Sequence, residues 1–187
     1  DNLRRVFLAA AGSEGVAVDC FEGESASLGS VGTLLAMLAS VANKQTAASV
    51  GELIRHPIIE SWLVRSGTAN PIALWDTCWA RHAPHGLEAM ADVAEQTCEQ
   101  EMLTKLVVLT QRLAGEAPAD QWATRVMDLL VDLLDTVDLD TASESTIELV
   151  HTCLIDLHEL SPDVRSLTAF AVIHLLLGRL STQSIHT

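Results

Sequence analysis

Three residues in the middle of the chain, Cys78, His82 and His85, have types and spacing that could bind a metal ion. Cys78 and His82 are four residues apart and would share one face of a helix, and His85 would follow the turn. A structural zinc site needs four ligands, and Glu88 is the nearest residue that could supply the fourth. A packed thiol beside surface histidines explains the same residues without a metal, and we favour this interpretation. We therefore assign no metal site and no cofactor.

Glu148 and His151 have the Glu-x-x-His spacing that di-iron helical bundles use. Those centres require a second copy of the motif and further glutamates that project into the bundle. The sequence contains no second copy. The pair therefore does not predict a di-iron centre.

The short motifs of nucleophilic and phosphate chemistry are missing from the sequence. The glycine pairs of residues 12–15 and 29–32 lack the G-x-S-x-G spacing of a nucleophile elbow. Neither pair is followed by a P-loop lysine, and no G-x-G-x-x-G occurs. Paired carboxylates for acid–base catalysis leave no local motif, because such pairs meet only in space. We expect that the chain is not an enzyme, and we assign no catalytic residue.

Trp75, Trp79 and His82 lie at helical spacing and would share one face of a helix. If that face is exposed, its aromatic rings would form a hot spot for a protein partner or bind a cation. The alternative, which we favour, is that both indole rings pack between helices. The three residues are candidates for partner binding.

Acidic residues are concentrated in one part of the chain. Residues 86–140 contain twelve acidic residues against Lys105, Arg112 and Arg125, and so carry −9 of the total net charge of −14. Asp128, Asp132 and Asp135 would lie away from the apolar face of their helix. A plain solvated face is one explanation; the other is an acidic ridge that speeds encounter with a basic partner. These aspartates are further candidates for binding a protein with a basic segment.

Composition restricts the class of protein. With 187 residues, 49% of them hydrophobic, residues 1–187 are expected to form a single helical domain with a sizeable core. A net charge of −14 disfavours nucleic acid and anionic membranes, which bind through Lys and Arg. The most apolar stretch, residues 167–180, is shorter than the roughly twenty residues needed to cross a bilayer. We expect a buried core helix there and no membrane insertion.

The cysteines and the first residues bear on the compartment. Four cysteines without a C-x-x-C pair predict free core thiols in a reducing compartment, the cytoplasm or the nucleus. The chain begins at Asp1 without a basic segment that leads into an apolar run, so we expect no signal peptide. A start without Met is compatible with a fragment of a larger chain. Residues 12–32 hold five of the ten glycines and are expected to form a mobile connection.

Prolines, capping residues and apolar periodicity predict helices along most of the chain. Thr46 is a predicted N-cap, Pro57, Pro71, Pro118 and Pro162 open helices, and residues 141–144 have capping-box spacing. A strand at residues 5–9 is the alternative to the first predicted helix. After these residues, no segment shows the apolar and polar alternation of a strand convincingly. The predicted helices cover residues 2–11, 28–42, 47–55, 57–64, 71–81, 86–115 as one helix or as two stacked near Glu99, 118–136, 142–160 and 162–180.

Four of the predicted helix starts are almost evenly spaced. Those near Leu28, Pro71, Pro118 and Pro162 are 43, 47 and 44 residues apart, close to the period of about 40 to 47 residues in armadillo and HEAT repeats. Within this frame, residues 34–67 run from a leucine-rich helix through Val-Gly-Glu-Leu-Ile and a proline into Ile-Ile and Trp-Leu. This segment resembles one armadillo unit. The resemblance implies a helical-repeat architecture.

The resemblance does not extend to the ligand. Armadillo proteins that read basic peptides line their groove with W-x-x-x-N. Here Trp75 is followed four residues later by Trp79, and Trp62 by Ser66, so the asparagine is missing. The resemblance therefore implies the architecture alone.

The sequence thus predicts an all-α fold, either a right-handed helical-repeat (armadillo/HEAT-like) solenoid or an irregular multi-helix bundle. Its predicted function is that of a protein-interaction scaffold with an acidic or Trp-containing surface. The alternative is a bundle that binds a small apolar ligand. Self-association is a further hypothesis, through a face of the last helix made of Leu167, Phe170, Ala171, Ile173, His174 and Leu177.

Overall fold

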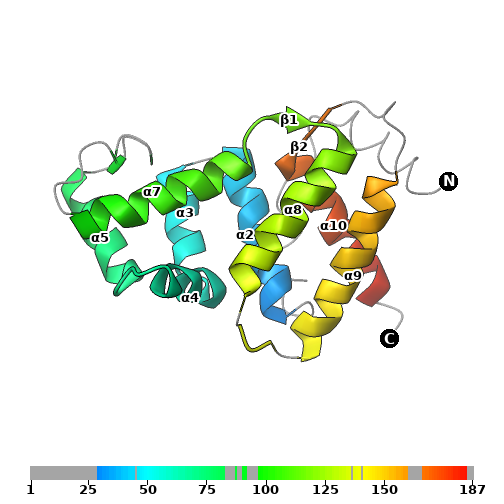
Figure 1. Ribbon diagram of the computed structural model, residues 1–187, viewed down its shortest axis with the longest axis horizontal. Helices are drawn as coiled ribbons and strands as arrows, with labels where there is room; N and C mark the ends of the chain where they lie inside the picture. Colours follow the sequence, from blue (N-terminus) through cyan, green and yellow to red (C-terminus); the bar gives the residue numbers. More distant parts are fainter. Residues whose placement is uncertain are drawn as a thin grey trace.

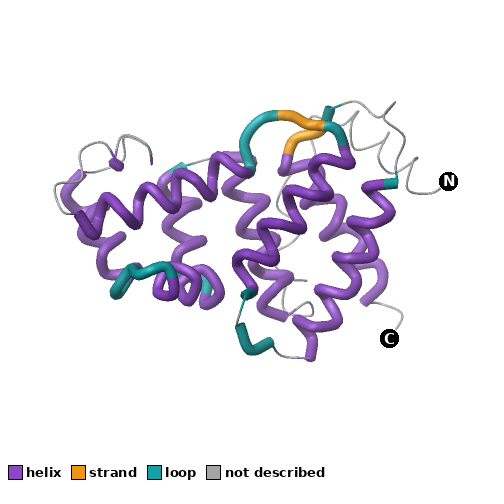
Figure 2. Tube along the Cα trace, viewed as in Figure 1, coloured by secondary structure: helices purple, strands orange, loops and turns teal. Residues whose placement is uncertain are grey.

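The computed structural model describes residues 29–44, 46–82, 87, 90–91, 97–135, 137–139, 141–159 and 166–184. In this part of the chain the protein is all-α, as predicted, with one short strand pair (Figures 1 and 2). The helices are α2 (Gly29–Lys44), α3 (Ala47–Ile54), α4 (Pro57–Arg65), α5 (Pro71–His82), α7 (Thr97–Arg112), α8 (Ala119–Leu134), α9 (Thr141–His158) and α10 (Ala169–Ser184). The strands are β1 (Glu116–Ala117) and β2 (Leu167–Thr168).

The helices form two groups that share contacts through α2 and α4. Helices α3, α4, α5 and α7 pack on one another, and α2, α8, α9 and α10 form the second group. Figure 1 shows the first group on the left and the second on the right. Contacts of α2 with α3 and of α4 with α8 join them. The chain therefore leaves the second group after α2 and returns to it with α8.

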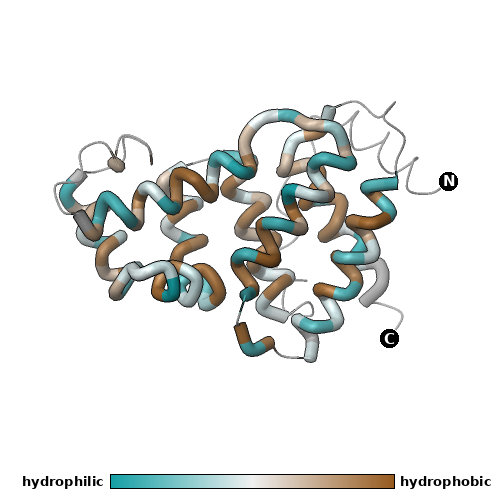
Figure 3. Tube along the Cα trace, in the orientation of Figure 1, coloured by the Kyte–Doolittle hydropathy of each residue, from teal (hydrophilic) through white to brown (hydrophobic). Residues whose placement is uncertain are grey.

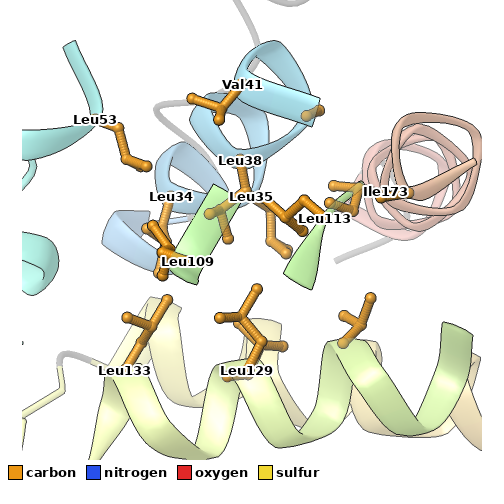
Figure 4. Packing of buried hydrophobic residues seen from close by; sticks show 14 of the residues in the cluster. Leu34, Leu35, Leu38, Val41, Leu53, Leu109, Leu113, Leu129, Leu133 and Ile173 are labelled. Atoms are coloured by element: carbon orange, nitrogen blue, oxygen red, sulfur yellow. The ribbon is translucent and has the colours of Figure 1, made fainter. Parts of the chain in front are cut away.

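The core is centred on α2, which packs against α3, α9 and α10. Leucines from α2, α7, α8 and the turn after α7 meet between α2 and α8 (Figure 4): Leu34, Leu35, Leu109, Leu113, Leu129 and Leu133. Each is almost completely buried, and a buried leucine contributes about 1.5–3 kcal/mol of transfer free energy. In Figure 3, hydrophilic and hydrophobic residues alternate along α8 and α9, as expected for helices with one buried and one exposed face.

Several predicted helix starts are confirmed together with their caps. The Thr46 hydroxyl accepts the backbone N–H of Ser49, and the Ser49 hydroxyl accepts that of Thr46, both at 3.2 Å. This reciprocal capping box opens α3. Pro57 and Pro71 begin α4 and α5 as expected. The sequence predicted Pro118 as the first residue of a helix. In the structure Pro118 is the N-cap of α8, so the helix begins one residue later.

The start of the last helix was predicted wrongly. Helix α10 begins at Ala169 instead of Pro162, because residues 167–168 form strand β2 and pair antiparallel with β1. The indole Nε1 of Trp122 also donates a hydrogen bond to the Leu167 carbonyl at 2.6 Å, which holds this segment extended. Two-residue strands are too short for an alternating pattern, so the sequence did not reveal them. Residues 160–165 lie outside the described residues.

This shift also weakens the regular spacing of helix starts. Gly29, Pro71, Ala119 and Ala169 are 42, 48 and 50 residues apart, less even than predicted. Residues 29–32 form the first turn of α2 instead of the end of a mobile connection. The rest of that connection and the expected helix at residues 2–11 with its strand alternative lie outside the described residues. Helix α7 runs through Glu99 without a break, so the alternative of two helices that meet near Glu99 is wrong.

Most of the apolar stretch near the C-terminus, from Ala169 to Leu180, belongs to a core helix as predicted, whereas residues 167–168 form β2. Leu167, Ile173 and Leu177 are 4% exposed or less, covered by the chain itself. Phe170, Ala171 and His174 are half-buried. The face proposed for self-association is therefore mostly covered within one molecule, which contradicts that choice of interface. Among the helices that the structure describes, none has the length and apolar character that a membrane crossing requires.

A polar junction of Ser30, His56 and Ser143 ties the first turn of α2 to two distant elements. The Ser143 hydroxyl accepts the Ser30 backbone N–H at 3.1 Å, and the two hydroxyls are 2.9 Å apart. His56 Nε2 donates to the Ser30 carbonyl at 3.0 Å, and its Nδ1 accepts the backbone N–H of Ile58 at 3.3 Å. Since Nδ1 accepts a hydrogen bond, His56 is the neutral tautomer protonated at Nε2. This neutral ring is the N-cap of α4.

We predict that protein stability decreases as the pH falls below about 6.5, the ordinary pKa of histidine. Burial lowers the pKa of His56, while its hydrogen bond to Ser30 partly opposes the shift. The unfolded chain therefore gains a proton before the folded one does, and stability is lost as the pH falls through the folded pKa. Chemical denaturation across this pH range measures the effect. His56→Asn keeps a capping side chain without a titrating ring; a parallel pH dependence in this variant would rule out His56 as the cause.

We predict that Gly51→Ala destabilises the protein. The added Cβ would lie 2.8 Å from Nε1 and 3.3 Å from Cε2 of the buried Trp75. Overpacking costs about 1–3 kcal/mol, against a gain in helix propensity of about 1 kcal/mol, so we expect a net loss of about 1 kcal/mol. Urea denaturation provides the measurement. Gly178→Ala in α10, whose Cβ would meet nothing within 4 Å, is the matched control and should gain about 0.5–1 kcal/mol. Equal gains in both variants would contradict the close contact.

Candidate binding surface on helices α8 and α9

The aromatic candidates on α5 do not form an exposed stripe. Trp75 is 2% exposed, and its ring packs against Gly51 of α3. Trp79 is half-buried and stacks on Trp75, with ring centroids 6.1 Å apart and an interplanar angle of 22°. The favoured interpretation, packing between helices, therefore holds for Trp75, which is unavailable to a partner. His82 ends α5, and its side chain lies outside the described residues.

The thiol of Cys78 is buried in the contact between α5 and α7. Burial raises the pKa of Cys78 to about 11, and the neighbouring Glu99 carboxylate adds to the shift. This thiol is therefore protonated at neutral pH and is neither a nucleophile nor a ready metal ligand. His85 and Glu88 lie outside the described residues, and the residues that are described contain no His, Cys, Asp and Glu group that could hold a metal.

Glu99 is the one acidic residue in the described core. It is 1% exposed, and its Oε1 accepts a hydrogen bond from Arg81 at 3.1 Å. Its other oxygen, Oε2, has no hydrogen-bond partner within the described part of the chain. The sequence counted Glu99 among the acidic residues of a surface, but this carboxylate is buried and contributes to packing between α5 and α7.

The three aspartates predicted on α8 are all exposed. Asp128, Asp132 and Asp135 follow one another at intervals of four and three residues, on the side of α8 away from the core. Asp132 Oδ2 accepts a hydrogen bond from Arg112 of α7 at 2.7 Å. Asp128 and Asp135 form no ion pair with any residue that the structure describes. Two of the three predicted aspartates are therefore available to a partner.

An apolar groove of about 550 Å³ lies between α8 and α9, beside this acidic row. Its apolar lining comes from Met127, Leu130, Val131, Leu134, Ile147 and Val150. Asp135 of α8 and Glu148 and His151 of α9 complete the lining. Val131 is 64% exposed, the highest value among the exposed large hydrophobic residues of the described chain, so the groove opens to solvent. Ile155, one turn after His151, is 45% exposed.

Sequence reasoning missed this groove. Glu148 and His151 were considered only as a metal pair, yet both are exposed beside α8 and belong to no metal cluster among the described residues. The available indication was Val131, an apolar residue among Asp128, Asp132 and Asp135 on the polar face. A groove needs two helices at a particular distance, and no local pattern encodes that distance.

The segment that contains α8 and α9 has a strongly negative charge. Residues 119–159 contain ten acidic residues and a single arginine, Arg125. The guanidinium of Arg125 lies over the Trp122 ring, 5.0 Å from its centroid, in a cation–π contact near the start of α8. This surface combines exposed apolar side chains with carboxylates and is suited to binding.

No protein-family model, no curated protein and no solved structure matches this chain.

We predict that Cys98 is the most reactive of the described cysteines. The expectation that every cysteine is a core thiol is wrong for Cys98, which is exposed, whereas Cys78 and Cys153 are buried and have raised pKa values. Because only the thiolate reacts, iodoacetamide at neutral pH should modify Cys98 first. Peptide mass spectrometry measures the modification, and labelling in denaturant is the control. Labelling of Cys78 at the rate of Cys98 in the folded protein would contradict its burial.

Proposed function

We propose that this chain is a protein-interaction domain that binds a basic partner through the surface of α8 and α9. The observation that carries the proposal is the exposed pair Asp128 and Asp135, which have no ion-pair partner in the described residues and flank the exposed Val131. Carboxylates of this kind steer a positively charged partner toward the surface. Exposed apolar area beside them provides the contact that holds it.

For the architecture, we propose an irregular helical bundle over a solenoid. Repeats in a solenoid contact only their neighbours along the chain. The proposal is supported by the packing of α2 against α9 and α10, which are the last described helices in the sequence. A bundle of this kind offers a local groove between two helices in place of an extended concave surface.

A small apolar ligand is the second candidate, favoured by the groove volume of about 550 Å³. That volume lies within the usual range of about 300–1,000 Å³ for ligand pockets. Such pockets bury most of their ligand, however, and the 64% exposure of Val131 makes this groove open. We therefore favour a macromolecular partner, and we propose no enzymatic activity.

The acidic surface and the buried cysteines bear on the class of partner and on the compartment. The partner we propose is a protein and not a nucleic acid, because the surface is acidic. We also propose an intracellular location, cytoplasmic or nuclear. It is supported by the thiols of Cys78 and Cys153, which are buried and form no disulfide.

We predict that the double variant Asp128→Lys, Asp135→Lys loses protein partners that the original chain captures from native lysate. Asp132 is left unchanged because it binds Arg112. Partners are identified by mass spectrometry at low and at raised salt, and salt should weaken their capture because exposed charges are screened.

The matched control is Glu52→Lys, Glu101→Lys, which reverses two exposed acidic residues on α3 and α7 and changes the net charge equally. This control should keep the partners. Equal loss in both variants would attribute the capture to overall charge, and equal retention would contradict a role for α8. Either result overturns the proposed surface.

A further inference from the structure

We propose that the groove between α8 and α9 binds an amphipathic helix of a partner protein, with Lys or Arg residues beside the apolar side of that helix. This inference rests on the proposed function, since it specifies what kind of segment occupies the same surface. The alternatives are a small apolar ligand, a second copy of this chain, and purely electrostatic binding.

The apolar lining has the length and spacing of a helix-binding site. Met127, Leu130 and Leu134 advance along α8 by three and four residues, and Ile147 and Val150 advance by three along α9. The lining residues therefore come from consecutive turns of both helices. The stretch from Met127 to Leu134 is about 10 Å long, or two helical turns. Two turns of a bound helix carry two or three apolar anchors at i, i+3 or i+4 and i+7.

The exposure of side chains in the groove differs from that of apolar residues elsewhere. Val64 on α4 and Val108 on α7 are each 52% exposed and are not part of the lining of this groove. Val131 is 64% exposed at the edge of the groove, above the buried Leu130 and Val150. Met127 adds a flexible thioether that can adjust to different partner side chains. An occupant would cover the exposed apolar area of Val131 and contact the buried floor.

Charge complementarity selects among the possible occupants. Asp135 and Glu148 line the groove from opposite helices, and neither forms an ion pair with a described residue. Lys or Arg beside the apolar face of a bound helix would pair with both carboxylates. A second copy of this acidic surface would instead be repelled. A small apolar ligand would gain nothing from the carboxylates.

The test uses a fluorescein-labelled peptide of about 18 residues, with leucines at i, i+3, i+4 and i+7 and lysines elsewhere. A peptide of the same composition in scrambled order has the same charge but no continuous apolar face. Fluorescence anisotropy gives the dissociation constant of each peptide. We expect the amphipathic peptide to bind at least about tenfold more tightly than the scrambled one.

Val131→Asp separates groove binding from attraction between charges. The substitution adds a negative charge, so purely electrostatic binding should become tighter. Docking in the groove should instead weaken by about tenfold, because a carboxylate replaces the apolar contact. Val108→Asp on α7 is the matched control, with the same charge change on an exposed valine away from the groove. Both valines are exposed, so we expect both variants to fold, and circular dichroism melting curves check this.

The results for the two peptides and the variants distinguish helix docking in the groove from binding to the acidic surface alone. Weakening by Val131→Asp alone supports helix docking. If Val131→Asp binds as tightly as the original chain, or if both peptides bind equally, the inference is wrong. In that case a loss of peptide binding in Asp128→Lys, Asp135→Lys would still support the acidic surface. If neither peptide binds and an apolar dye does bind in the groove, the proposed helix docking is wrong and a small apolar ligand is favoured.

Discussion

Burial of α2 on several sides is the constraint on which the rest of the structure depends. This helix lies between α3, α9 and α10, and seven of its residues are buried. The first backbone N–H groups of a helix have no partner within it and need one from elsewhere. Ser143 of α9 accepts the Ser30 N–H, and His56 bonds the Ser30 carbonyl. Hydrophobic packing and this polar junction therefore fix the positions of α4 and α9 together.

Three basic residues near the end of α8 and α4 form contacts within the fold and leave Asp128 and Asp135 without a cation. Arg65 donates a hydrogen bond to the Leu133 carbonyl at 3.1 Å, and Lys105 donates to the Ser66 carbonyl. Arg112 binds Asp132. These cations lie near the C-terminal ends of α8 and α4, where carbonyl groups lack helical partners. Asp128 and Asp135 remain without ion pairs in the described residues, and the negative charge faces solvent.

The candidate surface combines two features that arise separately. The packing of α8 against α9 buries Leu130 and Val150 and leaves Val131 exposed between them and solvent. The distribution of charge places Asp135 and Glu148 in the same groove. An apolar contact with a charged border provides both affinity and orientation for a partner segment. By contrast, Trp75 is buried against α3 and Glu99 is buried between α5 and α7, so neither side chain is available to a partner.

The sequence by itself determined the all-α class, the starts of α3, α4 and α5, and the acidic outer face of α8. These depend on caps, prolines and periodicity within one helix, which are local properties. Tertiary structure alone decided the rest. The start of α10 depends on the pairing of β2 with β1 and on the Trp122 hydrogen bond to Leu167, across 45 residues of chain. The burial of Trp75 depends on Gly51, and the groove beside Val131 depends on the distance between α8 and α9. Contacts between distant residues follow from three-dimensional packing, and no spacing along the chain encodes them.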